Sequence, residues 1–108
     1  MAERSYTPAE RRRRARIVTG GIRKALADIE DHRGDAEVAR IDAAAEERWR
    51  DERDEMARHL ATAKREAAAA KAKERLAPRE ERQAARQASI AARREAERVQ
   101  HKARRYGL

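Results

Sequence analysis

Larger apolar side chains recur at helical spacing in two stretches of the chain. The first stripe has steps of four, four and three residues and comprises Val18, Ile22, Leu26 and Ile29. The second stripe runs through Val38, Ile41, Ala45, Trp49, Met56 and Leu60 and continues in Ala63, Ala67 and Ala70. Both spacings average close to the ~3.6 residues of one helical turn. The pattern therefore predicts two amphipathic α-helices.

Signals for helix ends place the boundaries of these two helices. Thr7-Pro8-Ala9-Glu10 has the form of a capping box, with proline at the first helical position. The first helix is expected over about residues 8–32. Gly34 suits a left-handed position after a helix, and Asp35 suits the cap of the next one. The second helix is expected over residues 36–76.

A link this short favours antiparallel neighbours. Folding back at Gly34 would set Ile29 beside Val38 and Leu26 beside Ile41, with Ile22 and Val18 near Trp49. The pattern therefore predicts a helical hairpin held by its two apolar stripes.

Two glycines and one proline complicate this outline. Gly20-Gly21 lies within the first helix, where either a kink or a continuous helix is compatible with the sequence. Pro78 breaks the second helix, because the residue before a proline avoids the helical region. A third helix is expected over residues 79–105, with the stripe Ala85, Ala88, Ala92, Ala96, Val99, Ala103 and Tyr106. Such small side chains make a shallow seam, so we expect this helix to be exposed or to depend on a partner.

The predicted fold is all-α: an antiparallel helical hairpin with a long second helix plus a C-terminal Ala/Arg-rich helix, elongated or coiled-coil-like. Its parts are a tail over 1–7, the hairpin over 8–76 and a basic C-terminal helix over 77–108. Only thirteen larger apolar side chains lie between residues 17 and 99. Each contributes roughly 1.5–3 kcal/mol when buried, whereas ordering the backbone costs about 1–2 kcal/mol per residue.

So few anchors predict self-association. We expect a homodimer in which two hairpins form a four-helix bundle. The side chains assigned to this core are Val18, Ile22, Leu26, Ile29, Val38, Ile41, Trp49, Met56 and Leu60.

Charge is strongly segmented along the chain, whose net charge is +8. Residues 1–27 carry a net charge of +6, residues 28–56 of −7 and residues 57–108 of +9. Four successive arginines sweep about 300° of a helix, so Arg11–Arg14 cannot all lie inside a core. Basic clusters of this kind neutralise phosphates in a salt-sensitive way.

The leading functional hypothesis is a small non-enzymatic protein that associates with nucleic acid, DNA before RNA, through its basic ends. The predicted contacts are Arg11, Arg12, Arg13, Arg14, Arg16, Arg23, Lys24, Arg93, Arg94, Arg98, Lys102, Arg104 and Arg105. Tyr106 is a candidate for base stacking. The alternative is a helical scaffold or adaptor that oligomerises or binds an acidic protein partner. In that case Arg11–Arg14 could instead pair with the chain's own Asp51, Glu52, Asp54 and Glu55.

Other function classes have less support. Asp28–His32 and Glu55–His59 each offer two ligands, whereas a metal site needs three or four. The chain has no cysteine, no phosphate-binding loop and no nucleophile beside a histidine, so we expect no enzyme, cofactor, metal or small-molecule substrate. No apolar run approaches the ~20 residues that span a bilayer. We expect a cytoplasmic protein without membrane contact.

Overall fold

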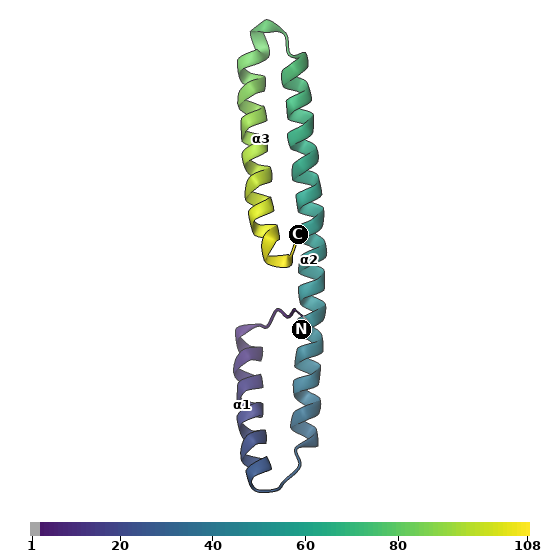
Figure 1. The fold of residues 1–108 in the computed structure, drawn as a ribbon, viewed down its shortest axis with the longest axis vertical. Helices are drawn as coiled ribbons and strands as arrows, with labels where there is room; N and C mark the ends of the chain where they lie inside the picture. The colour runs from purple at the N-terminus through teal and green to yellow at the C-terminus, as the bar shows by residue number, and fades with distance from the viewer. Residues whose placement is uncertain (1–2) are drawn as a thin grey trace. The chain divides into compact units, whose positions relative to one another are not determined.

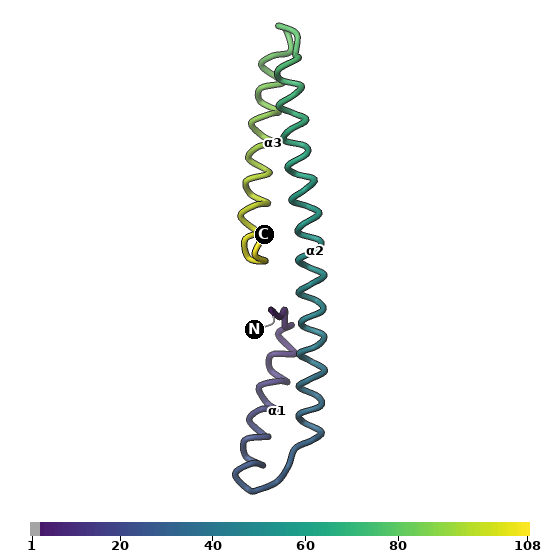
Figure 2. The backbone as a smooth tube through the Cα atoms, turned by 45° about the vertical axis from the view of Figure 1, so that its right-hand side comes forward, coloured from purple at the N-terminus to yellow at the C-terminus, as the bar shows by residue number. Residues whose placement is uncertain are grey.

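The computed structural model describes residues 3–108, and the fold is all-α as predicted. It contains three α-helices and two short 3-10 turns: α1 (Pro8–Leu26), α2 (His32–Leu76), η1 (Arg79–Glu81), α3 (Arg82–Ala103) and η2 (Arg104–Tyr106). The chain divides into two compact units, Met1–Asp51 and Glu52–Leu108, and the division falls within α2. Each unit is a helical hairpin: α1 lies beside the first part of α2, and α3 lies beside the later part (Figures 1 and 2). The predicted helical hairpin is therefore confirmed.

The start of α1 is the predicted capping box. The Thr7 hydroxyl accepts a hydrogen bond from the Glu10 backbone N–H at 3.1 Å. The Glu10 carboxylate in return accepts from the Thr7 backbone N–H at 2.8 Å. Two of the free donors at the helix start are thereby satisfied.

The turn between α1 and α2 differs from the prediction. α1 ends at Leu26 and α2 begins at His32, so the turn lies earlier than the predicted link at Gly34. The residue with a left-handed backbone is Asp28, at φ 59°. Aspartate is one of the few residues other than glycine that tolerate this conformation.

Asp31, and not Asp35, caps α2. Its carboxylate accepts from the Gly34 backbone N–H at 3.2 Å and from the Lys24 ammonium at 3.1 Å. The predicted role of Gly34 after a helix is wrong, because Gly34 lies in the first turn of α2. A side chain at this position would collide with the Asp31 carboxylate.

The earlier turn changes which residues of the two helices meet. Arg14 lies beside Asp42, and Glu10 lies beside Arg48. The predicted pairing of Val18 with Trp49 is therefore wrong, because the Asp28 turn shifts the register by several residues. Ser5, from the predicted N-terminal tail, donates its backbone N–H to the carbonyl of Ala45 at 3.0 Å.

This register turns the predicted apolar stripe of α1 outward. The residues that face α2 fall at steps of four, three and four, and all are half-buried: Glu10, Arg14, Ile17 and Gly21. The stripe assigned to the core is exposed instead: Val18 at 40%, Ile22 at 57%, Leu26 at 85% and Ile29 at 56%. Of the other predicted core residues, Leu60 is buried, and Val38, Ile41, Trp49 and Met56 are half-buried.

The second unit is held by a seam of small side chains. On α2 the seam runs through Met56, Leu60, Ala63, Ala67, Ala70 and Glu74, at alternating steps of four and three residues. On α3 it runs with the same steps through Ala85, Ser89, Ala92, Ala96, Val99 and Ala103. This alternation is the heptad pattern of coiled coils.

The C-terminal end of α3 is tied back to α2. The Tyr106 hydroxyl donates to Glu52 at 3.2 Å, and Arg53 donates to the Tyr106 carbonyl at 3.1 Å. The third helix is therefore packed within its unit and does not stand exposed as we expected. The alanine stripe of α3 can pack closely against α2 because α2 presents alanines opposite it.

Substituting Gly20 tests whether α1 is continuous. A methyl group at this position meets no atom within 4 Å, and α1 runs unbroken through it. Gly20→Ala should raise the free energy of unfolding by roughly 0.5–1 kcal/mol, because alanine favours the helix over glycine. Chemical denaturation followed by circular dichroism measures this change. Gly34→Ala is the control and should gain less, because its methyl group displaces the Asp31 cap. A loss of stability in Gly20→Ala would contradict a continuous α1.

Candidate nucleic-acid interface

The four consecutive arginines have different surroundings. Arg14 donates to Asp42 at 2.8 Å, and Arg13 forms an ion pair with Glu37. Arg11 and Arg12 are exposed and have no acidic partner among residues 3–108. The carboxylates that engage this segment belong to the first turns of α2 and not to the Asp51–Glu55 stretch proposed from the sequence. The shifted register explains this difference.

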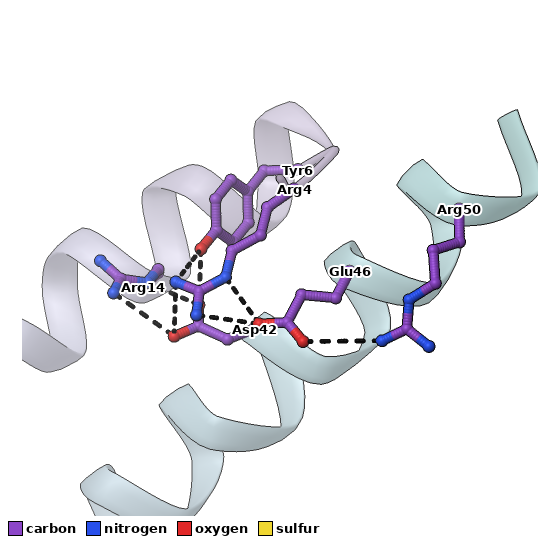
Figure 3. A network of polar contacts seen from close by, with 6 residues as sticks. All are labelled: Arg4, Tyr6, Arg14, Asp42, Glu46 and Arg50. Atoms are coloured by element: carbon purple, nitrogen blue, oxygen red, sulfur yellow. Dashed lines mark hydrogen bonds and ion pairs between the residues drawn. The ribbon is translucent and has the colours of Figure 1, made fainter. Parts of the chain in front are cut away.

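Asp42 is the centre of a polar network on the first unit (Figure 3). Its carboxylate accepts from the Tyr6 hydroxyl at 2.6 Å as well as from Arg14, whose guanidinium lies 5.8 Å from the centre of the Tyr6 ring. Arg4 lies 3.5 Å from Asp42 and 2.9 Å from Glu46. The hydrogen bond from Arg14 lowers the pKa of Asp42 below its usual value, against the opposing effect of burial, and Tyr6 adds to the lowering.

A second contact secures the N-terminal segment to α2. Arg48 donates to Glu10 at 2.7 Å and to the Ser5 carbonyl at 2.5 Å. The hydrogen bond from Arg48, followed by that from the Thr7 backbone, lowers the pKa of Glu10. Ala45 lies fully buried where this segment crosses α2. Cations and carboxylates therefore hold the first unit together as structural partners.

The remaining predicted cations of the first unit also fall into two groups. Lys24 pairs with Asp31 at 3.1 Å. Arg16 and Arg23 are exposed, and no carboxylate within the described chain pairs with them. Of the seven N-terminal contacts predicted from the sequence, the free ones are therefore Arg11, Arg12, Arg16 and Arg23.

The predicted C-terminal cations are less engaged. Arg98 pairs with Glu95 one turn earlier, and Arg93 approaches Glu97 at 4.0 Å. The others are exposed and have no carboxylate partner in the part of the chain described: Arg94, Lys102, Arg104 and Arg105. Tyr106 is half-buried, with its hydroxyl on Glu52 and the Arg105 guanidinium 5.8 Å from its ring centre. It is therefore engaged within the chain and not presented freely for base stacking.

On one side of the α2–α3 seam, the predicted Arg93 and Arg104 are joined by three cations that sequence reasoning missed: Lys64, Lys71 and Arg86. Two grooves of about 440 and 390 Å³ share Arg93 and are therefore adjacent. We define the basic face as the cations that line them: Lys64 and Lys71 from α2, and Arg86, Arg93 and Arg104 from α3 and the turn that follows it. The available signal was the seven-residue step from Lys64 to Lys71 and from Arg86 to Arg93, which places each pair on one helix face.

The two units differ in charge balance. Residues 1–51 carry 12 basic and 11 acidic side chains, whereas residues 52–108 carry 16 and 9. Nearly all of the basic excess of the chain therefore belongs to the second unit. Within the described chain only two of its Lys and Arg side chains, Arg93 and Arg98, form ion pairs with carboxylates.

The opposite side of the same seam is apolar. A groove of about 810 Å³ there is lined largely by alanines together with Leu76, which is 85% exposed. The second unit thus presents a basic side and an apolar side.

Two of the three histidines form isolated pairs with carboxylates. His32 contacts Glu30 at 2.7 Å, and His59 contacts Glu55 at 3.7 Å. Over residues 3–108 no group of three potential metal ligands comes together. Within the same residues no helix has the length and apolar character needed to cross a bilayer.

Comparison with known proteins gives no relative from which to transfer a function. No protein-family model, curated protein or solved structure matches the chain.

The lowered pKa values predict an acid-sensitive first unit. Because the folded pKa values of Asp42 and Glu10 lie below their unfolded values, their ion pairs stabilise the fold fully above about pH 5. That contribution disappears as the pH falls through the folded pKa values. Denaturation midpoints measured from about pH 6 to about pH 2.5 should therefore fall with acidification, and less so in Asp42→Asn.

The control is Asp54→Asn, which removes an exposed carboxylate that has no basic partner in the described chain. It should retain the acid dependence of the natural sequence. An equal acid dependence in Asp42→Asn and Asp54→Asn would contradict a stabilising role for the Asp42 network.

Proposed function

We propose that this protein associates with nucleic acid, DNA before RNA, by neutralising phosphates with the second unit. The observation that carries the proposal is the excess of cations over carboxylates in residues 52–108, concentrated along the basic face and the end of α3. Such cations release condensed counterions when they meet phosphates, which favours binding without sequence preference. The proposed role is non-enzymatic and cytoplasmic.

The spacing within the basic face supports a contact along a phosphate backbone. Lys64 and Lys71, and likewise Arg86 and Arg93, are seven residues apart on one helix, or about 10.5 Å along its axis. This separation is close to three base-pair steps of about 3.4 Å each, measured along the axis of the duplex. Arg94, Lys102 and Arg105 are further exposed cations at the end of α3 and in the turn that follows it.

The aromatic side chains favour duplex over single-stranded targets. Sequence-specific recognition of RNA depends on stacking unpaired bases on exposed rings. The chain has one tryptophan, two tyrosines and no phenylalanine. The hydroxyls of both tyrosines donate hydrogen bonds to carboxylates, and Trp49 is half-buried. Backbone phosphates of a duplex are the target that such a surface fits best.

The cations of the first unit have a smaller role in the proposal. Arg13, Arg14 and Lys24 already have carboxylate partners, and a phosphate would have to displace these. Arg16 and Arg23 are free to add to phosphate binding. The proposal also includes a homodimer, which would present the basic face twice.

A second candidate is a helical scaffold or adaptor that binds a protein partner. The apolar groove around Leu76 favours it, because exposed apolar surface of this kind marks protein contacts. If the protein is such a scaffold, we expect little DNA binding at physiological salt and a stable complex with a protein partner.

Salt-dependent binding to random duplex DNA separates the two candidates. Fluorescence anisotropy should show log affinity falling linearly with log salt, with a slope of about −0.9 per phosphate contact. The double variant Arg86→Gln/Arg93→Gln should weaken binding. It should also make the slope shallower by about 0.9 for each phosphate that the variant no longer neutralises.

The matched control is Arg33→Gln/Arg40→Gln. It also removes two exposed arginines seven residues apart on one helix, but from the balanced first unit. It should bind DNA nearly as well as the natural sequence. The nucleic-acid proposal is wrong if affinity does not depend on salt, or if the two double variants weaken binding equally.

A further inference from the structure

α1 carries a second line of side chains that α2 does not cover. It repeats the steps of four and three residues: Arg11, Ala15, Val18, Ile22 and Ala25, continuing to Ile29 in the turn. We call this the outer line. It lies about 100° around the helix from the line that faces α2, because most of its residues follow a covered one by a single position. A helix with two heptad lines is built to contact two neighbours.

The C-terminal half of the outer line borders a groove whose rim is acidic. The groove measures about 720 Å³, and its apolar residues include Val18, Ile22, Ile29 and Val38. Its rim carries four carboxylates: Asp28, Glu30, Asp31 and Asp35. His32 lines it beside Glu30, and Lys24 pairs with Asp31 from outside, but no lysine or arginine lines the groove, although the chain as a whole carries +8. The groove therefore fits a helix that is apolar in its middle and basic at one end.

The N-terminal half of the outer line carries the arginines that this groove lacks. Arg11 lies on the line and Arg12 beside it, and neither has a carboxylate partner within residues 3–108. Along one edge of α1 the order is thus basic, apolar and acidic. A segment with this order is complementary to itself when two copies run antiparallel, because the basic end of each meets the acidic end of the other.

We infer that a second copy of this chain occupies the groove, with the two α1 helices antiparallel about a twofold axis between Val18 and Ile22. Val18 then faces Ile22 of the second copy, and Ala15 faces Ala25 of the second copy. Arg11 and Arg12 approach Asp28 and Glu30 of the second copy. Contacts of this kind are isologous, as in most homodimers. The inference gives the proposed homodimer its interface and does not depend on nucleic-acid binding.

This arrangement also gives each of the four arginines a partner. Arg13 and Arg14 pair with Glu37 and Asp42 of their own chain. Arg11 and Arg12 pair across the twofold axis. The exposed apolar side chains of the outer line become the centre of the interface, which is where binding energy concentrates in protein complexes.

Disulfide trapping tests the antiparallel register. The chain contains no cysteine, so introduced cysteines report only their own contacts. A mixture of Ala15→Cys and Ala25→Cys chains should form a disulfide-linked dimer under mild oxidation. Either variant alone should not, because identical positions lie about 15 Å apart along the axis, beyond the ~7 Å reach of a disulfide. A parallel pairing would give the opposite result and would overturn the inference, as would the absence of any crosslink.

Light scattering after size exclusion tests the interface by mass. The natural chain should show twice its 12.4 kDa. Ile22→Glu should shift the population to the single mass, because it places a carboxylate in the apolar centre of the interface. Leu76→Glu is the control, since it adds the same charge at an exposed apolar position of the second unit, and it should stay dimeric.

The outcomes separate the interface from the other proposals. A natural chain of single mass would overturn both the dimer and its interface. A dimer dissociated by Leu76→Glu but not by Ile22→Glu would keep the dimer and reject this interface. DNA binding is measured separately, so its failure leaves the inference standing.

Discussion

The shortage of large apolar side chains is the constraint on which the rest of the structure depends. With thirteen such residues between positions 17 and 99, neither unit has a conventional core. Among the described residues only Ala45, Leu60, Ala63 and Ala103 are buried apolar side chains. Three of these four are alanines. Helix pairing must therefore rest on other interactions, and the two units solve this problem in different ways.

Ion pairs hold the helices of the first unit together, whereas close packing of small side chains holds those of the second. In the first unit, carboxylates of α1 and α2 pair with arginines of the facing segment, as in Arg14–Asp42 and Arg48–Glu10. Partly exposed ion pairs contribute only about 0–1 kcal/mol each, so several are needed. In the second unit the alanine seam lets α2 and α3 pack along matched heptads. That seam uses few charges, which leaves the cations of the second unit free for an outside partner.

Local signals in the sequence predicted the helices well. The Thr7–Glu10 capping box and the Pro78 break have strong and specific backbone requirements, and both were correct. The second apolar stripe was also correct, because its members line α2 from Val38 to Ala70. The basic character of both ends could likewise be read directly, although the sequence alone did not distinguish paired cations from free ones.

The turn at Asp28 and the face of α1 could not be predicted. Gly34 offered the more obvious left-handed position, and nothing local showed that Asp31 would cap α2 and take Lys24 as a partner. That choice moved the register, and with it the assignment of Val18, Ile22 and Leu26 to the core. The stripe had the correct spacing, but periodicity does not say which neighbour a helix face meets. Lys64, Lys71 and Arg86 were missed for a similar reason, since the basic face forms only when α3 lies against α2.

The central claim is that ion pairs, and not apolar burial, hold α1 on α2. The most direct test compares amide hydrogen exchange of α1 and of α3 at about 0.05 M and about 0.5 M salt. At the higher salt concentration the Debye length is only a few ångströms, so interactions between exposed charges are largely screened. We predict that protection of α1 amides falls markedly at high salt while that of α3 amides changes little. Equal protection of α1 at both salt concentrations would contradict the claim.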